Sequence, residues 1–260
     1  MTETAAGCRG ISRDGIKYIA MLTMLVNHTA TIFAAPGLAR ELMLDVGYFT
    51  AITMCYFLVE GYRHTRSRKK YGRRLLLFAL ASQLPFELAF SPALELQDGK
   101  LTGLEFTTVN MMGTLFLGFL ILEARRRIRN PALRAAAQCM LVLVSILCDW
   151  ALLAGIFVIL FDSRYGSKRR LAGAYGIAVL LFALFNYPAY LSYGYSAAGC
   201  AVMAVLACAG LAASGAVILF FYNGKRMERG QNFSKWFFYL FYPVHLLVLG
   251  LAHVAVQAFF

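Results

Sequence analysis

Long runs of apolar residues, separated by short polar and basic segments, are the main pattern along this chain. Many of them approach the roughly 20 residues that a helix needs to cross the ~30 Å hydrocarbon core of a bilayer. Runs of this length predict spanning helices, because a spanning strand needs only about 9–11 residues. We assign nine runs, at residues 16–35, 44–62, 75–91, 107–123, 134–148, 150–162, 171–188, 196–222 and 236–258.

Composition supports a bilayer as the solvent. Hydrophobic residues make up 60% of the 260 residues and charged residues only 15%, which is far too apolar for an ordinary soluble domain. No internal repeat and no separate soluble domain is visible. The sequence therefore predicts an all-α polytopic integral membrane protein, with about nine transmembrane helices in a single domain over residues 1–260.

The positive charges alternate along the nine runs. Of the 25 Lys and Arg residues, 23 fall in segments that would lie on one side of the membrane, and only Arg40 and Lys100 fall on the other. Because Lys and Arg are retained on the cytoplasmic side, this pattern predicts a cytoplasmic N-terminus and an external C-terminus in a cell membrane. Joining the two short runs 134–148 and 150–162 would break the alternation. The net charge of +12 thus indicates membrane sidedness, not a nucleic-acid partner.

The cysteines do not indicate a metal site or a disulfide framework. Six are present, none in a CxxC pair, and five lie inside apolar stretches, where cysteine behaves as a small hydrophobic residue. We interpret them as packing residues and predict no metal.

Several ionisable side chains fall within the apolar runs, where such groups are costly and are candidates for function. Asp14, Lys17 and His28 share one helix stripe, and His28 lies about 16 Å beyond Lys17 along the helix axis. Gln83 and Glu87 are four residues apart and share a helix face. Glu87 reaches a depth close to that of His28, so the two could pair.

Three more polar residues complete the predicted pocket. Asn110 begins the fourth run, Asp149 lies between the fifth and sixth, and His245 lies near the middle of the ninth. Together these residues outline a polar pocket that opens outward. Each has a structural alternative: a histidine can bond a neighbouring helix, and Asp149 at a turn can cap one.

Basic residues concentrate between the second and third runs. A dense set of guanidinium groups is suited to bidentate phosphate binding, although such a loop can also act only as a topology signal. The candidate ligands for a phosphorylated cytosolic cofactor are Arg63, Arg66, Lys70, Arg73 and Arg74, together with Arg125 and Arg126. Neither GxGxxG nor a P-loop is present.

Several segments together resemble the TraX family of membrane acetyltransferases, named for the protein that acetylates the N-terminus of conjugative pilin. The resemblance runs almost end to end. Its most specific part is the aromatic-rich FYP followed by a histidine in the last segment. The segments are DGIKYIAMLTMLVNH (14–28), YFLVEGYRHTRSRKKYGRRLLLFALASQLPFELA (56–89), NMMGTLFLGF (110–119), CDWALLAGI (148–156) and YNGKRMERGQNFSKWFFYLFYPVHLLVLGL (222–251).

The resemblance implies acetyl-CoA as the donor, taken from the cytoplasm, and an amine or hydroxyl acceptor near the outer face. It implies that His28 and His245 are site residues. Tyr239 and Tyr242 lie on turns adjoining His245 and could orient an acceptor. The family typically has Asp-His where this chain has Asn27-His28. Glu87 or Asp149 could supply the missing carboxylate.

Three functional hypotheses follow. In the first, the chain is an acetyltransferase in which His28 acts as general base or briefly carries the acyl group. In the second, it is a transporter or flippase whose buried charges form a substrate path. In the third, it is an inactive family member that binds a partner. The acceptor stays open between a peptide N-terminus, a lipid, a glycan and a small molecule, and the oligomeric state is open as well.

Overall fold

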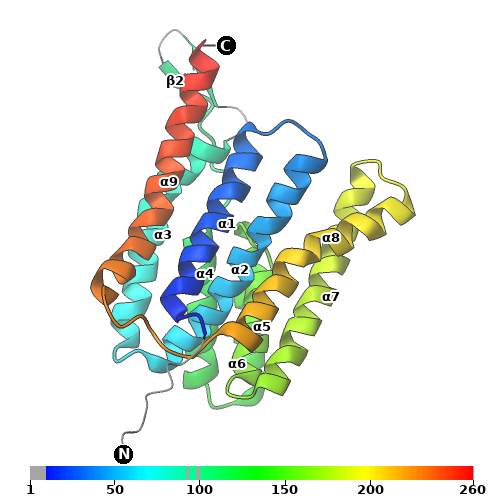
Figure 1. Cartoon of the computed structure of the whole chain (residues 1–260). Helices are drawn as coiled ribbons and strands as arrows, with labels where there is room; N and C mark the ends of the chain where they lie inside the picture. Colours follow the sequence, from blue (N-terminus) through cyan, green and yellow to red (C-terminus); the bar gives the residue numbers. More distant parts are fainter. Residues whose placement is uncertain (1–9, 92–93, 98–99, 260) are drawn as a thin grey trace, which may run out of the picture.

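The structure, a computed structural model, describes residues 10–91, 94–97 and 100–259. This part of the chain forms nine α-helices, one 3₁₀ turn, one π-helical turn and one short antiparallel strand pair (Figure 1). The bounds are α1 (Arg13–Phe33), α2 (Leu38–His64), α3 (Arg68–Phe90), β1 (Glu95–Gln97), β2 (Lys100–Thr102), α4 (Met111–Arg127), α5 (Pro131–Val144), η1 (Ser145–Leu147), α6 (Leu153–Arg164), α7 (Lys168–Ser192), α8 (Ala197–Ala216), η2 (Val217–Phe221) and α9 (Gln231–Phe259). The predicted helical fold class is confirmed, and only the two three-residue strands depart from it.

Most helices begin at a serine or asparagine that caps the first turn. Ser12, Ser67 and Ser167 accept hydrogen bonds from backbone amides of α1, α3 and α7. Asn110 and Asn130 do the same for α4 and α5. These caps satisfy amides that have no partner within the helix. The short polar segments between the apolar runs therefore contain the helix caps as well as most of the positive charges.

Helix α2 lies at the centre of the bundle and packs against α1, α4, α6 and α8. Gly210 on α8 approaches the α2 backbone at Asp45 and Phe49 so closely that a side chain there would collide with it. The last helix, α9, returns to pack against α3 and α1 (Figure 1). This return sets the last helix beside the first and positions the site described below.

The nine apolar runs correspond one-to-one with the nine helices, but two helices are short. α5 has 14 residues and α6 has 12, or about 21 and 18 Å of helix, less than the ~30 Å core. By length and composition four helical stretches could cross a membrane: α2, α7, α8 with η2, and α9 to Gln257. The chain is therefore a membrane protein, and about nine spans stays a prediction.

The turn between α5 and α6 is held against the start of α4. Val109 donates its amide to the Leu147 carbonyl, and the Asp149 amide donates to the Val109 carbonyl, both at 2.8 Å. Non-helical backbone at membrane depth is tolerated where it is buried in protein or lines a water-filled cavity. This turn lies on the wall of the cavity described in the next section, at Asp149 and Trp150.

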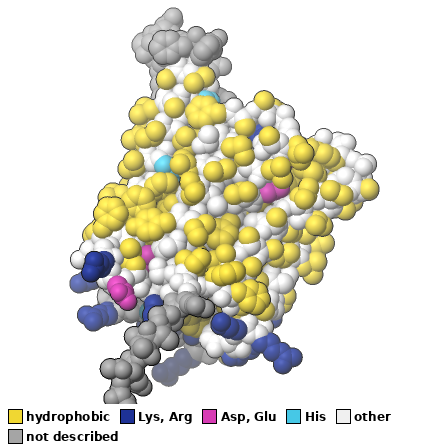
Figure 2. Space-filling model, viewed as in Figure 1, with side chains coloured by type: hydrophobic (Ala, Val, Ile, Leu, Met, Phe, Trp, Pro, Cys, Tyr) yellow, Lys and Arg dark blue, Asp and Glu magenta, His cyan; other side chains and the backbone are white. Residues whose placement is uncertain are grey.

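The surface separates apolar from basic regions. Figure 2 shows hydrophobic side chains over most of the visible face and most Lys and Arg side chains at the end where α1 begins. Leu77, Leu80 and Leu84 form an exposed stripe on α3, each more than half accessible. Such a surface would be unfavourable in water and fits contact with lipid. Arg9 and Asp98 lie outside the described residues.

Candidate functional site

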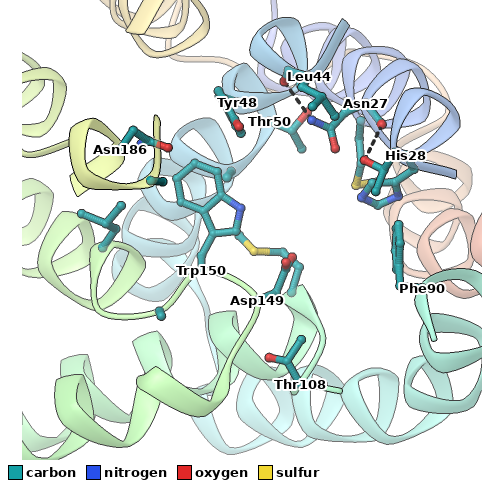
Figure 3. Close-up of a pocket in the computed structure, with 18 of the residues that line it drawn as sticks. Asn27, His28, Leu44, Tyr48, Thr50, Phe90, Thr108, Asp149, Trp150 and Asn186 are labelled. Atoms are coloured by element: carbon teal, nitrogen blue, oxygen red, sulfur yellow. Dashed lines mark hydrogen bonds between the residues drawn. The ribbon is translucent and has the colours of Figure 1, made fainter. Parts of the chain in front are cut away.

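A cavity of about 620 Å³ lies in the half of the molecule away from the basic end (Figure 3). Its walls come from α1, α2, α3, α4, α7 and the turn between α5 and α6. The wall includes the polar side chains of Asn27, His28, Arg40, Glu41, Asp149 and Asn186 and the aromatic side chains of Tyr48, Trp150, Phe182, Tyr190 and Tyr193. The structure thus brings together three of the predicted pocket residues: Asn27, His28 and Asp149.

His28 on α1 bonds His245 on α9. The His28 Nδ1 atom lies 2.9 Å from the His245 Nε2 atom, with the two ring planes 13° apart. The His245 Nδ1 atom lies 2.7 Å from the Phe241 carbonyl oxygen. His28 lines the cavity, whereas His245 is buried behind it. The edge of the Phe90 ring packs against His28 at a centroid distance of 5.1 Å.

Glu87 does not pair with His28, contrary to the prediction from depth. Its carboxylate accepts hydrogen bonds from the Gln83 side chain at 2.6 Å and from the backbone amide and hydroxyl of Thr107 at 3.0 and 2.9 Å. The face of α3 that carries Glu87 meets the segment before α4, not α1. Glu87 therefore holds that segment in place.

Gln83 and Asn110 belong to the same hydrogen-bond network as Glu87. The Asn110 amide donates to the Gln83 side-chain oxygen at 2.7 Å and to the Ala79 carbonyl at 2.8 Å, and its own oxygen caps α4. Tyr242 accepts a hydrogen bond from the Met111 amide at 3.1 Å. None of these predicted pocket residues lines the cavity.

Asp149 is the acidic side chain on the cavity wall that the structure leaves without a partner. Its carboxylate makes no hydrogen bond or ion pair with any described residue, whereas Glu41 pairs with Arg40 at 3.5 Å. Because the Arg40–Glu41 pair is neutral overall, an ionised Asp149 would make the cavity negative. A positively charged group would be favoured there.

An aromatic wall lies beside Asp149. The Trp150 ring stacks on Phe182 with centroids 5.6 Å apart, and Tyr48 packs edge-on against both. The sequence analysis did not select these three residues. The available signal was Trp150 next to Asp149 in the break between two apolar runs.

Asp14 and Lys17 lie at the basic end, away from the cavity. Asp14 accepts hydrogen bonds from the Met227 amide at 2.9 Å and the Ser234 hydroxyl at 2.8 Å. It therefore joins the start of α1 to the start of α9. The Lys17 ammonium lies over the rings of Phe57 and Phe238, at 5.7 and 5.0 Å. Asp14, Lys17 and His28 lie on one helix, α1, but the first two are at the basic end whereas His28 lines the cavity.

A second pocket, of about 430 Å³, lies at the basic end, between the loop that joins α2 to α3, the start of α3 and the end of α4. Its walls contain basic side chains from both predicted clusters and the N-terminal turn of α3. The lining residues are Thr65, Arg66, Ser67, Arg68, Lys69, Glu123, Arg126 and Arg127. Arg66 and Arg126 are two of the predicted phosphate ligands, and Arg68, Lys69 and Arg127 come from the same two basic clusters.

The other predicted phosphate ligands lie outside that pocket. Arg63 and Arg125 both bind Asp162 on α6, at 2.6 and 3.0 Å. Arg74 lies over the rings of Tyr71 on α3 and Tyr239 on α9, where these two helices pack together. Lys70 and Arg73 are exposed.

Comparison with known proteins places these features in a family. The family model described as TraX protein matches residues 12–253, which include both histidines, Asp149 and the basic pocket. The chain belongs to the TraX family. A protein of Dichelobacter nodosus described as a probable fimbrial assembly protein FimC, serogroup H1, is 31% identical over 250 residues, covering 93% of this chain and 96% of that protein. No solved structure matches the chain significantly.

Proposed function

We propose that this TraX-family protein transfers an acetyl group from cytoplasmic acetyl-CoA to an acceptor in the outer cavity. The observation that carries the proposal is His28, a basic side chain that lines a 620 Å³ cavity and is held from behind by His245. A histidine is suited to general acid–base chemistry near neutral pH. The choice of acetyl-CoA as the donor rests on the family resemblance.

The proposed orientation follows from the basic end. If Lys and Arg remain cytoplasmic, the N-terminus is inside, the C-terminus is outside, and the cavity lies toward the outside of a cell membrane. The short helices α5 and α6 enter from the basic end and return to it. This orientation therefore holds whether they count as two of nine spans or as one re-entrant hairpin beside seven longer helices.

The basic pocket is the proposed place for the CoA phosphates. Arg66, Arg68 and Arg126 line it, and guanidinium groups bind phosphate oxygens in pairs. The N-terminus of α3 adds backbone amides and a favourable helix dipole. Binding there would keep the phosphates in the cytoplasm while the thioester reaches toward His28.

The outer cavity favours an amine acceptor over a hydroxyl. The unpaired Asp149 carboxylate can bind an ammonium group, and the Trp150 ring beside it can add a cation–π contact. A neutral hydroxyl would leave the carboxylate charge uncompensated. An amine enters as ammonium and loses one proton to water before it reacts.

The proposed reaction balances with these groups. The neutral amine attacks the thioester carbonyl carbon, a C–N bond forms, and the C–S bond breaks. His28 takes the proton from the attacking nitrogen and passes it to the departing thiolate, giving an amide and CoA thiol. In the variant with an acyl-histidine intermediate, His28 attacks the carbonyl carbon first and CoA thiolate leaves. The amine then takes the acetyl group from His28, and its proton goes to the thiolate.

Fimbrial assembly, named for the Dichelobacter nodosus relative, suggests the first acceptor to test: the amino terminus of a fimbrial subunit. Purified protein in lipid nanodiscs should transfer label from acetyl-CoA to such a peptide. Absence of transfer and of acetyl-CoA binding at millimolar donor would reject the proposal. The transporter alternative predicts solute uptake into liposomes without acetyl-CoA, and the inactive-member alternative predicts unchanged acetylation in a deletion strain.

A further inference from the structure

We infer that His245 is a positioning residue that fixes the tautomer of His28, so that the Nε2 lone pair of His28 faces the cavity. The inference rests on the proposed function and names a role within its site. It starts from the Phe241 carbonyl oxygen, which can only accept a hydrogen bond. At 2.7 Å from that oxygen, the His245 Nδ1 atom must carry the hydrogen.

The second bond follows from the first. With its hydrogen on Nδ1, a neutral His245 has a lone pair on Nε2 and accepts there. The His28 Nδ1 atom, 2.9 Å away, is then the donor. A neutral His28 consequently has no hydrogen on Nε2, which is the ring nitrogen that can take a proton or attack a carbonyl carbon.

The burial of the two rings separates their roles. His245 is 7% exposed and does not line the cavity, whereas His28 does. His245 therefore cannot touch the acceptor and acts through His28. The Phe241 ring stacks on His245 at a centroid distance of 4.8 Å, so one residue of α9 orients His245 through both its carbonyl and its ring.

This arrangement replaces the carboxylate that the family pattern places beside the histidine. Asn27 directs its amide to the Leu44 carbonyl, and Glu87 is bonded to Gln83 and Thr107. Neither is bonded to His28. The orienting acceptor comes instead from α9, and the Phe241 carbonyl behind it can stabilise the positive charge when His28 is protonated.

The first test measures the tautomer directly and needs no activity. In protein labelled with ¹⁵N-histidine and held in nanodiscs, ring-nitrogen shifts distinguish protonated from unprotonated nitrogen, and His28→Asn identifies the His28 signals. We expect the neutral His28 ring to carry hydrogen on Nδ1 alone. Hydrogen on Nε2 in the resting protein would overturn the inference, even if acetyl transfer is observed.

The second test uses rescue by a matched acceptor. His245→Gln places an amide oxygen near the position of the lost Nε2 and should keep the His28 tautomer and turnover within about tenfold. His245→Leu offers no acceptor, so we expect Nε2-protonated His28 to appear and kcat to fall by about 10²-fold or more, with donor KM little changed; a wrong tautomer in a hydrolase triad costs about 10⁴. His253→Leu on the same helix is the control and should change neither quantity.

Two outcomes of the second test would reject the role of His245. One is equal loss in the Gln and Leu variants with the His28 tautomer unchanged in both. The other is full kcat in His245→Leu. If the wild-type protein transfers no acetyl group at all, the proposed function fails, and the tautomer measurements in the wild type and both variants still decide whether His245 orients His28.

Discussion

The side-chain amide of Asn27 donates a hydrogen bond to the backbone carbonyl of Leu44, at 2.8 Å. The bond joins α1 to α2 at the cavity wall, where Gly47 leaves room for Asn27. A carboxylate could not make this bond, because it has no hydrogen to donate. Asparagine is therefore the residue that fits this packing, although the family resemblance implies aspartate there.

Restoring the family residue should harm this protein. Asn27→Asp would set a carboxylate oxygen against the Leu44 carbonyl, and an unsatisfied buried polar group costs about 1–3 kcal/mol. We expect a lower midpoint of thermal unfolding in detergent and no gain in acetyl transfer. The control is Asn186→Asp, which adds the same charge to the cavity wall and loses only a bond within α7, to the Phe182 carbonyl. Higher activity with unchanged stability in Asn27→Asp would show that His28 works better with a carboxylate.

Replacing the proposed base should remove activity but leave the fold intact. Loss of a general base costs about 10²- to 10⁴-fold in rate, whereas an interhelical hydrogen bond in a membrane averages only ~0.6 kcal/mol. His28→Ala should therefore abolish transfer while the purified protein still binds acetyl-CoA. Retention of more than about a tenth of parental turnover, against the ~10²-fold minimum for a lost base, would make the His28 bond structural.

Part of this site was predictable and part was not. The Gln83–Glu87 pair on one face of α3 is confirmed as a 2.6 Å hydrogen bond, because helical periodicity determines which residues share a face. Periodicity does not say which neighbour that face meets. His28 and His245 are 217 residues apart, and their contact depends on α9 packing beside α1, which no local pattern encodes.

The helices, too, were only partly predictable from the sequence. Apolar run length located all nine, since burial in lipid requires continuous apolar sequence. It also showed that runs 134–148 and 150–162 are short, but it could not distinguish a re-entrant hairpin from a pair of spans, because both have the same hydropathy at this length. The turn at Asp149 is explained by its backbone bonds to Val109, which join segments 40 residues apart.

The basic pocket can be tested with two charge-matched double variants. Arg66→Gln with Arg126→Gln removes two charges from the pocket, and Lys70→Gln with Arg129→Gln removes two exposed charges outside it. The first pair should raise the acetyl-CoA KM by about tenfold or more, since charge-assisted bonds contribute about 1.5–3 kcal/mol each, with kcat little changed. An equal change in both pairs would indicate only a general effect of positive charge.

The proposed orientation can be tested by labelling single cysteines in a variant that lacks the native ones. A cysteine at Ser192, the last residue of α7, should react with an impermeant maleimide added outside whole cells. A cysteine at Glu228, before α9, should react only after the cells are opened. The reverse pattern would invert the orientation and place the His28 cavity toward the cytoplasm.

Asp149 supplies the sharpest test of the acceptor class. If its carboxylate binds the acceptor ammonium, Asp149→Asn should raise the KM for an amine acceptor by about 10- to 100-fold, as expected for the loss of a charge-assisted bond of roughly 1.5–3 kcal/mol, while the acetyl-CoA KM is unchanged. The control is Glu41→Gln, on the same cavity wall but paired with Arg40, which should have a smaller effect. An analogue with a hydroxyl in place of the amine has no charge for Asp149 to bind, so its KM should be the same in wild type and Asp149→Asn. If the amine and hydroxyl analogues lose affinity equally in Asp149→Asn, Asp149 affects the shape of the cavity but does not recognise the charge of the acceptor. The acceptor then need not be an amine.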